Sequence, residues 1–206
     1  MSSISSRKIC DSFSRFRIKI YAFSTFFTAI VVWLILKWNE KADEIGNERY
    51  ILIIAYMIGL ATGLHLLNLL AIPFIALIIY FKKYEPNWKT FGYTVAITGI
   101  VFFLIHNVII KGMPKIADSI GVWGAACLVL SVFVFMIWAI KNQKLILSLS
   151  LTSMVLILIG YSTYALIFIR SNQDPGIDEN DPETIEAFIS YLEREQYGDV
   201  GILFII

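Results

Sequence analysis

The sequence predicts an all-α protein, a polytopic membrane helix bundle of about six membrane helices, of which one pair is short or broken. Two observations carry this prediction. The chain has 206 residues, 58% of them hydrophobic and only 16% charged, whereas a soluble domain is about half apolar and about a quarter charged. The excess of apolar residues lies in long runs without Asp, Glu, Lys or Arg, which are typical of membrane spans.

The uncharged runs define the expected spans. They contain 17, 32, 21, 22 and 25 residues and lie at 20–36, 50–81, 90–110, 119–140 and 145–169. About 20 apolar residues cross a hydrocarbon core of about 30 Å, so four of these runs predict one span each, the first a short one. The expected spans of the transmembrane domain, residues 21–169, are 21–38, 50–65, 68–81, 90–110, 120–140 and 145–169.

The run from 50 to 81 is the exception, because a single helix of this length would measure about 48 Å. A split near His65 and Asn68 gives two helices that are each short for a crossing. Short or irregular helices at membrane depth persist only when they are buried in protein or line a wet cavity. We therefore expect two helices that meet at His65–Asn68.

His65 and Asn68 are three positions apart and share one helix face, so both side chains can point into one interior or cavity. Polar groups inside a membrane are costly and indicate a functional site by default. The alternative is an interhelical hydrogen bond that only holds the bundle together, which is the more common role. The sequence leaves both interpretations open.

After Arg170 the composition becomes polar and acidic. Within the segment 170–206 we expect a loop and then an amphipathic helix over about 182–197, with Asp181 as its N-cap and Pro182 in its first turn. Its apolar residues follow helical spacing on one face: Ile185, Phe188, Ile189 and Leu192. This helix is expected to lie on the membrane surface or on the membrane domain itself.

The distribution of Lys and Arg orients the bundle only weakly. With six spans, one side carries eight of these residues and the other nine, five of which precede residue 20. Without those five the count is eight to four, which places 170–206 outside the cytoplasm. We expect residues 1–20 to be an atypical, non-native N-terminus, and because both chain ends look cut we expect an internal fragment.

The remaining features exclude several function classes. The formal net charge of +1 gives no reason to expect a nucleic-acid partner. No P-loop, nucleophile elbow, zinc-protease motif or dinucleotide fingerprint occurs, and the acidic residues lack metal-ligand spacing. We therefore assign no catalytic residue, no metal and no cofactor from the residues alone, and the lipid bilayer is the one partner they imply.

Three stretches together resemble one known family: "YAFSTFFTAIVVWLILKW", "GLATGLHLLNLLAIPFIALIIYFKK" and "RSNQDPGIDENDPETIEAFISYLEREQYGD". They are similar to a bacterial, Bacteroidetes-type family of multi-span proteins of unknown function. That family is related to the transmembrane protein O-mannosyltransferase of vertebrates and belongs to the GT-C glycosyltransferase superfamily. The resemblance covers about 21–199.

The resemblance implies a function that the residues alone do not. GT-C enzymes transfer a sugar from a polyprenyl-phosphate donor to an acceptor, here a protein, on the extracytoplasmic side. In a bacterium this implies the inner membrane, with 170–206 in the periplasm. The candidate donor-phosphate residues that match the family pattern are His65, Asn68, Arg170, Asn180, Arg194 and Glu195.

The chain also departs from the family pattern. Members carry an acidic motif in the first extracytoplasmic loop, where the catalytic carboxylate of such enzymes lies, and this motif is absent here. Whether the chain is an enzyme therefore stays open. We expect the membrane-embedded portion of a glycosyltransferase that is inactive as an isolated chain. The alternative is a non-catalytic scaffold or a transporter-like subunit.

Overall fold

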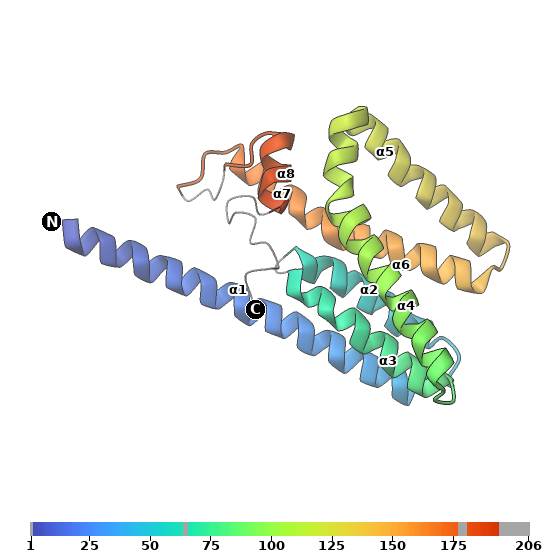
Figure 1. The fold of residues 1–206 in the computed structure, drawn as a ribbon. Coiled ribbons are helices and arrows are strands. Elements are labelled where there is room, and N and C mark those ends of the chain that lie inside the picture. Colours follow the sequence, from blue (N-terminus) through green and yellow to red (C-terminus); the bar gives the residue numbers. More distant parts are fainter. Residues whose placement is uncertain (1, 64–65, 177–180, 194–206) are drawn as a thin grey trace. The chain divides into compact units, whose positions relative to one another are not determined.

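The structure is a computed structural model that describes residues 2–63, 66–176 and 181–193, and every regular element in these ranges is a helix. The all-α prediction is confirmed. The chain forms two compact units, Met1–Thr98 and Gly99–Ile206, and each is described by itself. Figure 1 shows the helices with their labels.

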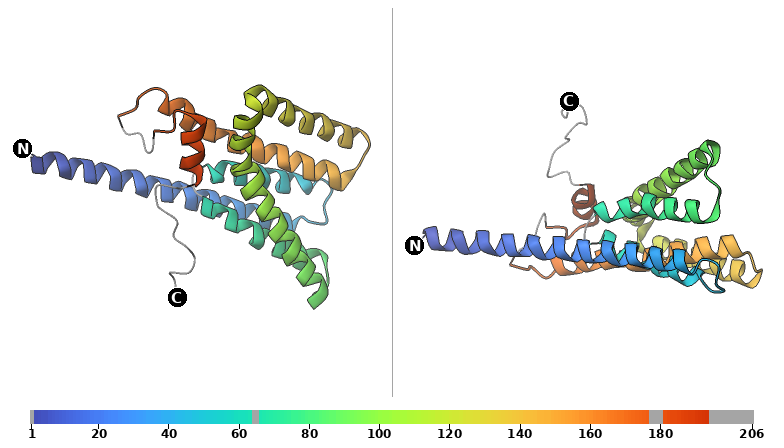
Figure 2. Two further views of the ribbon diagram at one scale, coloured as in Figure 1. Left: turned by 45° about the horizontal axis from the view of Figure 1, so that its top comes forward. Right: turned by 90° about the horizontal axis from the view of Figure 1, so that it is seen from below.

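Unit 1 is built around one long helix, α1 (Ser2–Glu40). The views in Figures 1 and 2 show two shorter helices alongside its C-terminal half, and both contact it. The further elements of the unit are α2 (Glu48–Thr62), the 3-10 helix η1 (Leu66–Leu70), α3 (Ala71–Lys83) and the beginning of α4 (Trp88–Leu104).

The core of unit 1 lies on one face of α1. Its buried residues recur at i, i+3, i+4 and i+7, the spacing of a single helix face: Val31, Leu34, Ile35 and Trp38. On α2, the buried Ala55 and Ala61 are small, which allows close approach between helices in a membrane. The opposite faces of these helices remain apolar and exposed, as expected for surfaces that meet lipid.

The run from 50 to 81 is interrupted in the structure. α2 has 15 residues and α3 has 13, fewer than the roughly 20 needed for a crossing. Pro73 explains why a new helix starts here, because proline lacks the N–H of a helix interior and is tolerated only in a first turn. Asn68, expected in the second helix, lies instead in η1 between the two.

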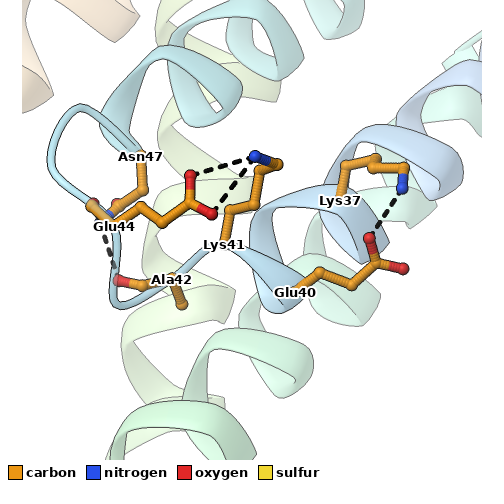
Figure 3. A network of polar contacts seen from close by, with 6 residues as sticks. All are labelled: Lys37, Glu40, Lys41, Ala42, Glu44 and Asn47. Carbon is orange, nitrogen blue, oxygen red and sulfur yellow. Dashed lines mark hydrogen bonds and ion pairs between the residues drawn. The ribbon is translucent and has the colours of Figure 1, made fainter.

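The loop between α1 and α2 is organised by Asn47 (Figure 3). Its Nδ2 atom donates to the carbonyl oxygens of Ala42 at 2.7 Å and Glu44 at 2.9 Å. The indole Nε1 of the fully buried Trp38 donates to Asn47 Oδ1 at 3.2 Å. These bonds connect the polar loop to the end of the apolar core.

Unit 2 contains the end of α4 and all later elements. These are the π-helix η2 (Ile105–Ile110), α5 (Gly112–Lys141), α6 (Leu145–Tyr161), the 3-10 helix η3 (Ser162–Tyr164), α7 (Ala165–Ser171) and α8 (Ile185–Glu193). Within α5, Gly121 has φ +76° and a non-helical backbone, so two helical segments meet there at a kink. Figure 1 shows the sharp bend of α5. Glycine suits this position because it has no Cβ to oppose a positive φ.

Four helices in the described part of the chain are long and apolar enough to cross a membrane. They are Tyr21–Glu40, Trp88–Gly121, Trp123–Lys141 and Leu145–Ser171. The expected span 90–110 lies within a longer helix, which continues through η2 as far as Gly121. The pair α2 and α3 supplies the difference from the six expected spans, since neither helix is long enough to count.

The amphipathic helix α8 begins at Ile185, three residues later than the expected 182–197. The N-cap is Thr184 rather than Asp181, because Thr184 Oγ1 accepts the N–H of Ala187 at 3.1 Å. The Phe188 ring lies 6.5 Å from that of Tyr164 and 6.1 Å from that of Phe168. Of the two alternatives, α8 therefore packs on the membrane domain. The expected C-terminal end of the helix lies outside the described residues.

Pro114 leaves the carbonyl of Ile110 without its usual helical donor, and a distant residue supplies another one. In a continuous α-helix the carbonyl of Ile110 would accept the N–H of residue 114, which proline lacks. The hydroxyl of Tyr161, 51 positions later, donates to this carbonyl at 2.8 Å, and the bond is buried. A carbonyl at membrane depth needs such a partner, because hydrocarbon offers none.

We expect Tyr161→Phe to lower the free energy of unfolding by about 1–3 kcal/mol, since it removes the donor and leaves the Ile110 carbonyl unpaired. The measurement is unfolding of the purified protein in mixed micelles, followed by circular dichroism. Tyr93→Phe is the matched control, because Tyr93 is 69% exposed. Equal stability of the two variants would show that the hydrogen bond contributes nothing.

Candidate functional site

The six candidate residues from the sequence fall into two groups. Asn68 in unit 1 and Arg170 in unit 2 are described by the structure. The other four lie outside the described residues: His65, Asn180, Arg194 and Glu195. Their placement at a site stays a prediction. The geometry below therefore concerns Asn68 and Arg170, each within its own unit.

Asn68 lies at the break between α2 and α3 and is only 5% exposed. Its Nδ2 atom donates to the carbonyl oxygen of Ala61 at 2.8 Å, in the last turn of α2. The last carbonyls of a helix have no partner within the helix, so this bond caps the end of α2. The carboxamide thereby replaces the backbone N–H that the next turn of helix would supply.

The carboxamide oxygen of Asn68 faces α1. Ser24 Oγ donates to Oδ1 at 3.0 Å, and Thr28 Oγ1 lies 2.8 Å from the same oxygen. Thr28 Oγ1 is also 3.0 Å from the carbonyl oxygen of Ser24, so its single proton is shared between the two acceptors. Asn68 thus connects α1, η1 and α2 at one point.

These bonds favour the structural interpretation of Asn68. A primary amide offers two donors and an acceptor with two lone pairs, and three of these four positions are occupied by protein groups. The one position left is the second N–H of Nδ2, and with Asn68 only 5% exposed it is poorly accessible to a ligand phosphate. We therefore assign Asn68 to holding the helix break in place, next to the segment that contains His65.

We expect Asn68→Ala to lower the free energy of unfolding by about 1–3 kcal/mol, because the Ala61 carbonyl loses its partner in an apolar setting. Asn142→Ala is the control, since Asn142 donates a similar bond to the carbonyl of Trp138 at 2.8 Å but is exposed. Denaturant unfolding in micelles compares the two. A larger loss in the Asn142 variant would contradict the assignment.

Arg170 occupies a different environment, at the end of α7 and of the candidate span Leu145–Ser171. Its side chain is exposed, and Nη1 donates to Gln173 Oε1 at 3.2 Å. Among the described residues no carboxylate forms an ion pair with it. The guanidinium therefore retains most of its donors for an anionic group.

A hollow of about 510 Å³ adjoins Arg170, between α7 and the start of the following loop. Its remaining lining is apolar except for Ser171 and Gln173 and includes Leu166, Ile167, Ile169 and Pro175. A charged group beside an apolar wall at the end of a span suits an amphiphile whose anionic head lies at the interface. This arrangement can bind and orient an anion, and it contains no described carboxylate.

A second hollow in unit 2 is almost entirely apolar. It measures about 440 Å³ and lies between α5, α6 and α8. Met113, Phe133, Tyr164 and Phe188 are among its walls. The packing of α8 on the longer helices thus leaves an apolar space between them.

The sequence did not reveal the partners of these groups. Ser24 and Thr28 look like isolated hydroxyls in an apolar run, and Tyr161 looks like a membrane aromatic residue. The four-residue spacing of Ser24 and Thr28 places two hydroxyls on one helix face, and Pro114 leaves a carbonyl without its usual donor. Both features indicate a group that requires a hydrogen-bond partner. Neither feature identifies that partner.

Comparison with known families agrees with the resemblance noted above. Residues 8–89 match the family model described as "Protein O-mannosyl-transferase TMEM260 N-terminal domain". This portion of the chain is similar to the O-mannosyltransferase family. No curated protein and no solved structure matches the chain. The matched residues fall within unit 1, so the O-mannosyltransferase-like portion includes α1, α2, α3 and the turn that follows.

Proposed function

We propose that this protein is the membrane-embedded portion of a GT-C-type glycosyltransferase, a protein O-mannosyltransferase-like chain that uses a polyprenyl-phosphate-linked sugar. The observation that carries the proposal is the match of residues 8–89 to the TMEM260 N-terminal domain family. The apolar membrane-spanning helices support it, because a polyprenyl tail dissolves only in hydrocarbon. The proposed location is a bacterial inner membrane, with 170–206 on the periplasmic side.

The donor phosphate has a proposed partner in Arg170. A polyprenyl tail within the bilayer holds its phosphate at the level of the lipid headgroups, and we expect α7, which ends the candidate span Leu145–Ser171, to end at the same level. Arginine binds phosphate oxygens through two parallel N–H donors, which makes such contacts strong and directional. His65, Asn180, Arg194 and Glu195 lie outside the described residues and stay candidates for donor binding from the family resemblance alone, while Asn68 is proposed to hold the helix break next to His65 in the sequence.

The proposed reaction needs a carboxylate that deprotonates an acceptor hydroxyl. The hydroxyl oxygen then attacks the anomeric carbon as the polyprenyl phosphate leaves. We assign no residue of this chain to the role of the base. The proposal is therefore that the isolated polypeptide binds the donor without transferring the sugar.

A direct test is donor binding by the purified protein, with a short-chain polyprenyl-phosphate-mannose as the probe. We expect Arg170→Ala to weaken binding about ten- to a hundredfold, because hydrogen bonds to charged groups contribute about 1.5–3 kcal/mol. Arg170→Lys should lose less, since it keeps the charge but not the paired donors. Arg49→Ala is the matched control, an exposed arginine at the start of α2.

The outcomes separate the alternatives. Unchanged binding by Arg170→Ala would remove Arg170 from the donor site. Absence of donor binding by the unmodified chain would favour a non-catalytic scaffold or a transporter-like subunit. Release of mannosylated acceptor by the isolated chain would contradict the proposed inactivity.

A further inference from the structure

An aromatic pocket lies at the turn between α3 and α4 in unit 1. It measures about 540 Å³ and is lined by Tyr80, Phe81, Pro86, Asn87, Trp88 and Phe91. Trp88 is 88% exposed, although it is one of the largest apolar side chains of the protein. Large apolar groups that stay exposed around a hollow indicate a surface that meets a partner.

The pocket is held open by hydrogen bonds within the turn. Tyr80 is 2% exposed, and its hydroxyl accepts the N–H of Asn87 at 3.0 Å and lies 2.8 Å from Thr90 Oγ1. The ring of Phe91 is 6.0 Å from that of Tyr80 and 6.3 Å from that of Trp88, both in edge-to-face geometry. The buried tyrosine therefore fixes the turn on which the exposed rings stand.

The position of the pocket along the membrane normal follows from the helix that leaves it. Trp88 is the first residue of the candidate span Trp88–Gly121. The end of a span lies at the boundary between hydrocarbon and headgroups, where tryptophan and tyrosine are enriched. We therefore expect the pocket to open among lipid headgroups.

The lysines of unit 1 differ in whether they form ion pairs. Three lysines of unit 1 have carboxylate partners, in the ion pairs Lys37–Glu40 at 2.7 Å, Lys41–Glu44 at 3.1 Å and Lys82–Asp43 at 3.2 Å (the first two in Figure 3). Lys83 and Lys89 flank the pocket in the sequence, and neither has a carboxylate partner in the described part of the chain.

Lys83 contacts an aromatic ring instead. Its Nζ atom lies 5.6 Å from the centre of the Trp38 ring, a cation–π contact that keeps the charge while directing it. Lys89 is exposed next to Trp88. Glu85 is the single acidic residue between them and is exposed as well, so the turn carries a net positive charge.

We propose that this turn is a binding site for the headgroup of an anionic phospholipid. Lys83 and Lys89 bind the phosphate, and the exposed rings of Phe81 and Trp88 cover the glycerol and the first carbons of the acyl chains. Basic side chains beside a membrane surface attract anionic lipids, with about 1 kcal/mol for each. The site is independent of the proposed glycosyltransferase function.

The test titrates the purified chain in detergent with a short-chain phosphatidylglycerol and counts bound lipid by native mass spectrometry. We expect Lys83→Gln with Lys89→Gln to weaken binding about thirtyfold, from the loss of two charges. Lys141→Gln with Lys144→Gln is the matched control, because it removes two exposed lysines at the turn between α5 and α6.

The rings are tested separately. Trp88→Ala should weaken phosphatidylglycerol binding several-fold, and Trp123→Ala should not, although Trp123 is 86% exposed and also begins a candidate span. Phosphatidylcholine should bind more weakly than phosphatidylglycerol to the unmodified chain. Equal binding of the two lipids, or an equal loss in both lysine pairs, would overturn the proposal.

Discussion

The absence of water in the hydrocarbon core is the constraint on which this structure depends. Wherever a helix is interrupted at membrane depth, its freed carbonyls need donors from elsewhere in the protein. At two interruptions a side chain donates a hydrogen bond to the freed carbonyl. The Ala61 carbonyl receives the amide of Asn68, and the Ile110 carbonyl receives the hydroxyl of Tyr161. Each bond lies within one of the two units and fixes a contact between segments that the apolar surfaces alone would leave free to slide.

In unit 1, hydrogen bonds connect the packed helices at both ends of the span Tyr21–Glu40. Toward the start of the first span, Asn68 joins the helix break to Ser24 and Thr28. At its other end, Trp38 and Asn47 connect the core to the polar loop. These polar side chains are therefore hydrogen-bonded within the protein. Anionic ligands are left with the exposed cations at the ends of the helices, and both proposed sites use such groups.

The sequence predicted much of the fold and little of the site. Run lengths predicted the membrane helices, and the long run from 50 to 81 predicted an interruption, which the structure has at η1. The family resemblance is confirmed over residues 8–89. The expected span 90–110 stopped before Lys111 because the uncharged run ends there, whereas the helix itself extends past Lys111, Gly112 and Pro114 as far as Gly121. A π-helix and a first-turn proline carry the helix through these residues instead.

By itself the sequence determined that the chain is an all-α membrane protein, because the length of an uncharged run is compared directly with the thickness of hydrocarbon. It also marked an interruption near His65 and Asn68, whose polar side chains would need partners inside a membrane. Only the tertiary structure decided that Asn68 is a connection between helices, and that Tyr161 supports the helix before Pro114. The reason is physical: a local sequence specifies the need for a hydrogen bond, whereas its donor arrives from a segment about 40–50 residues away.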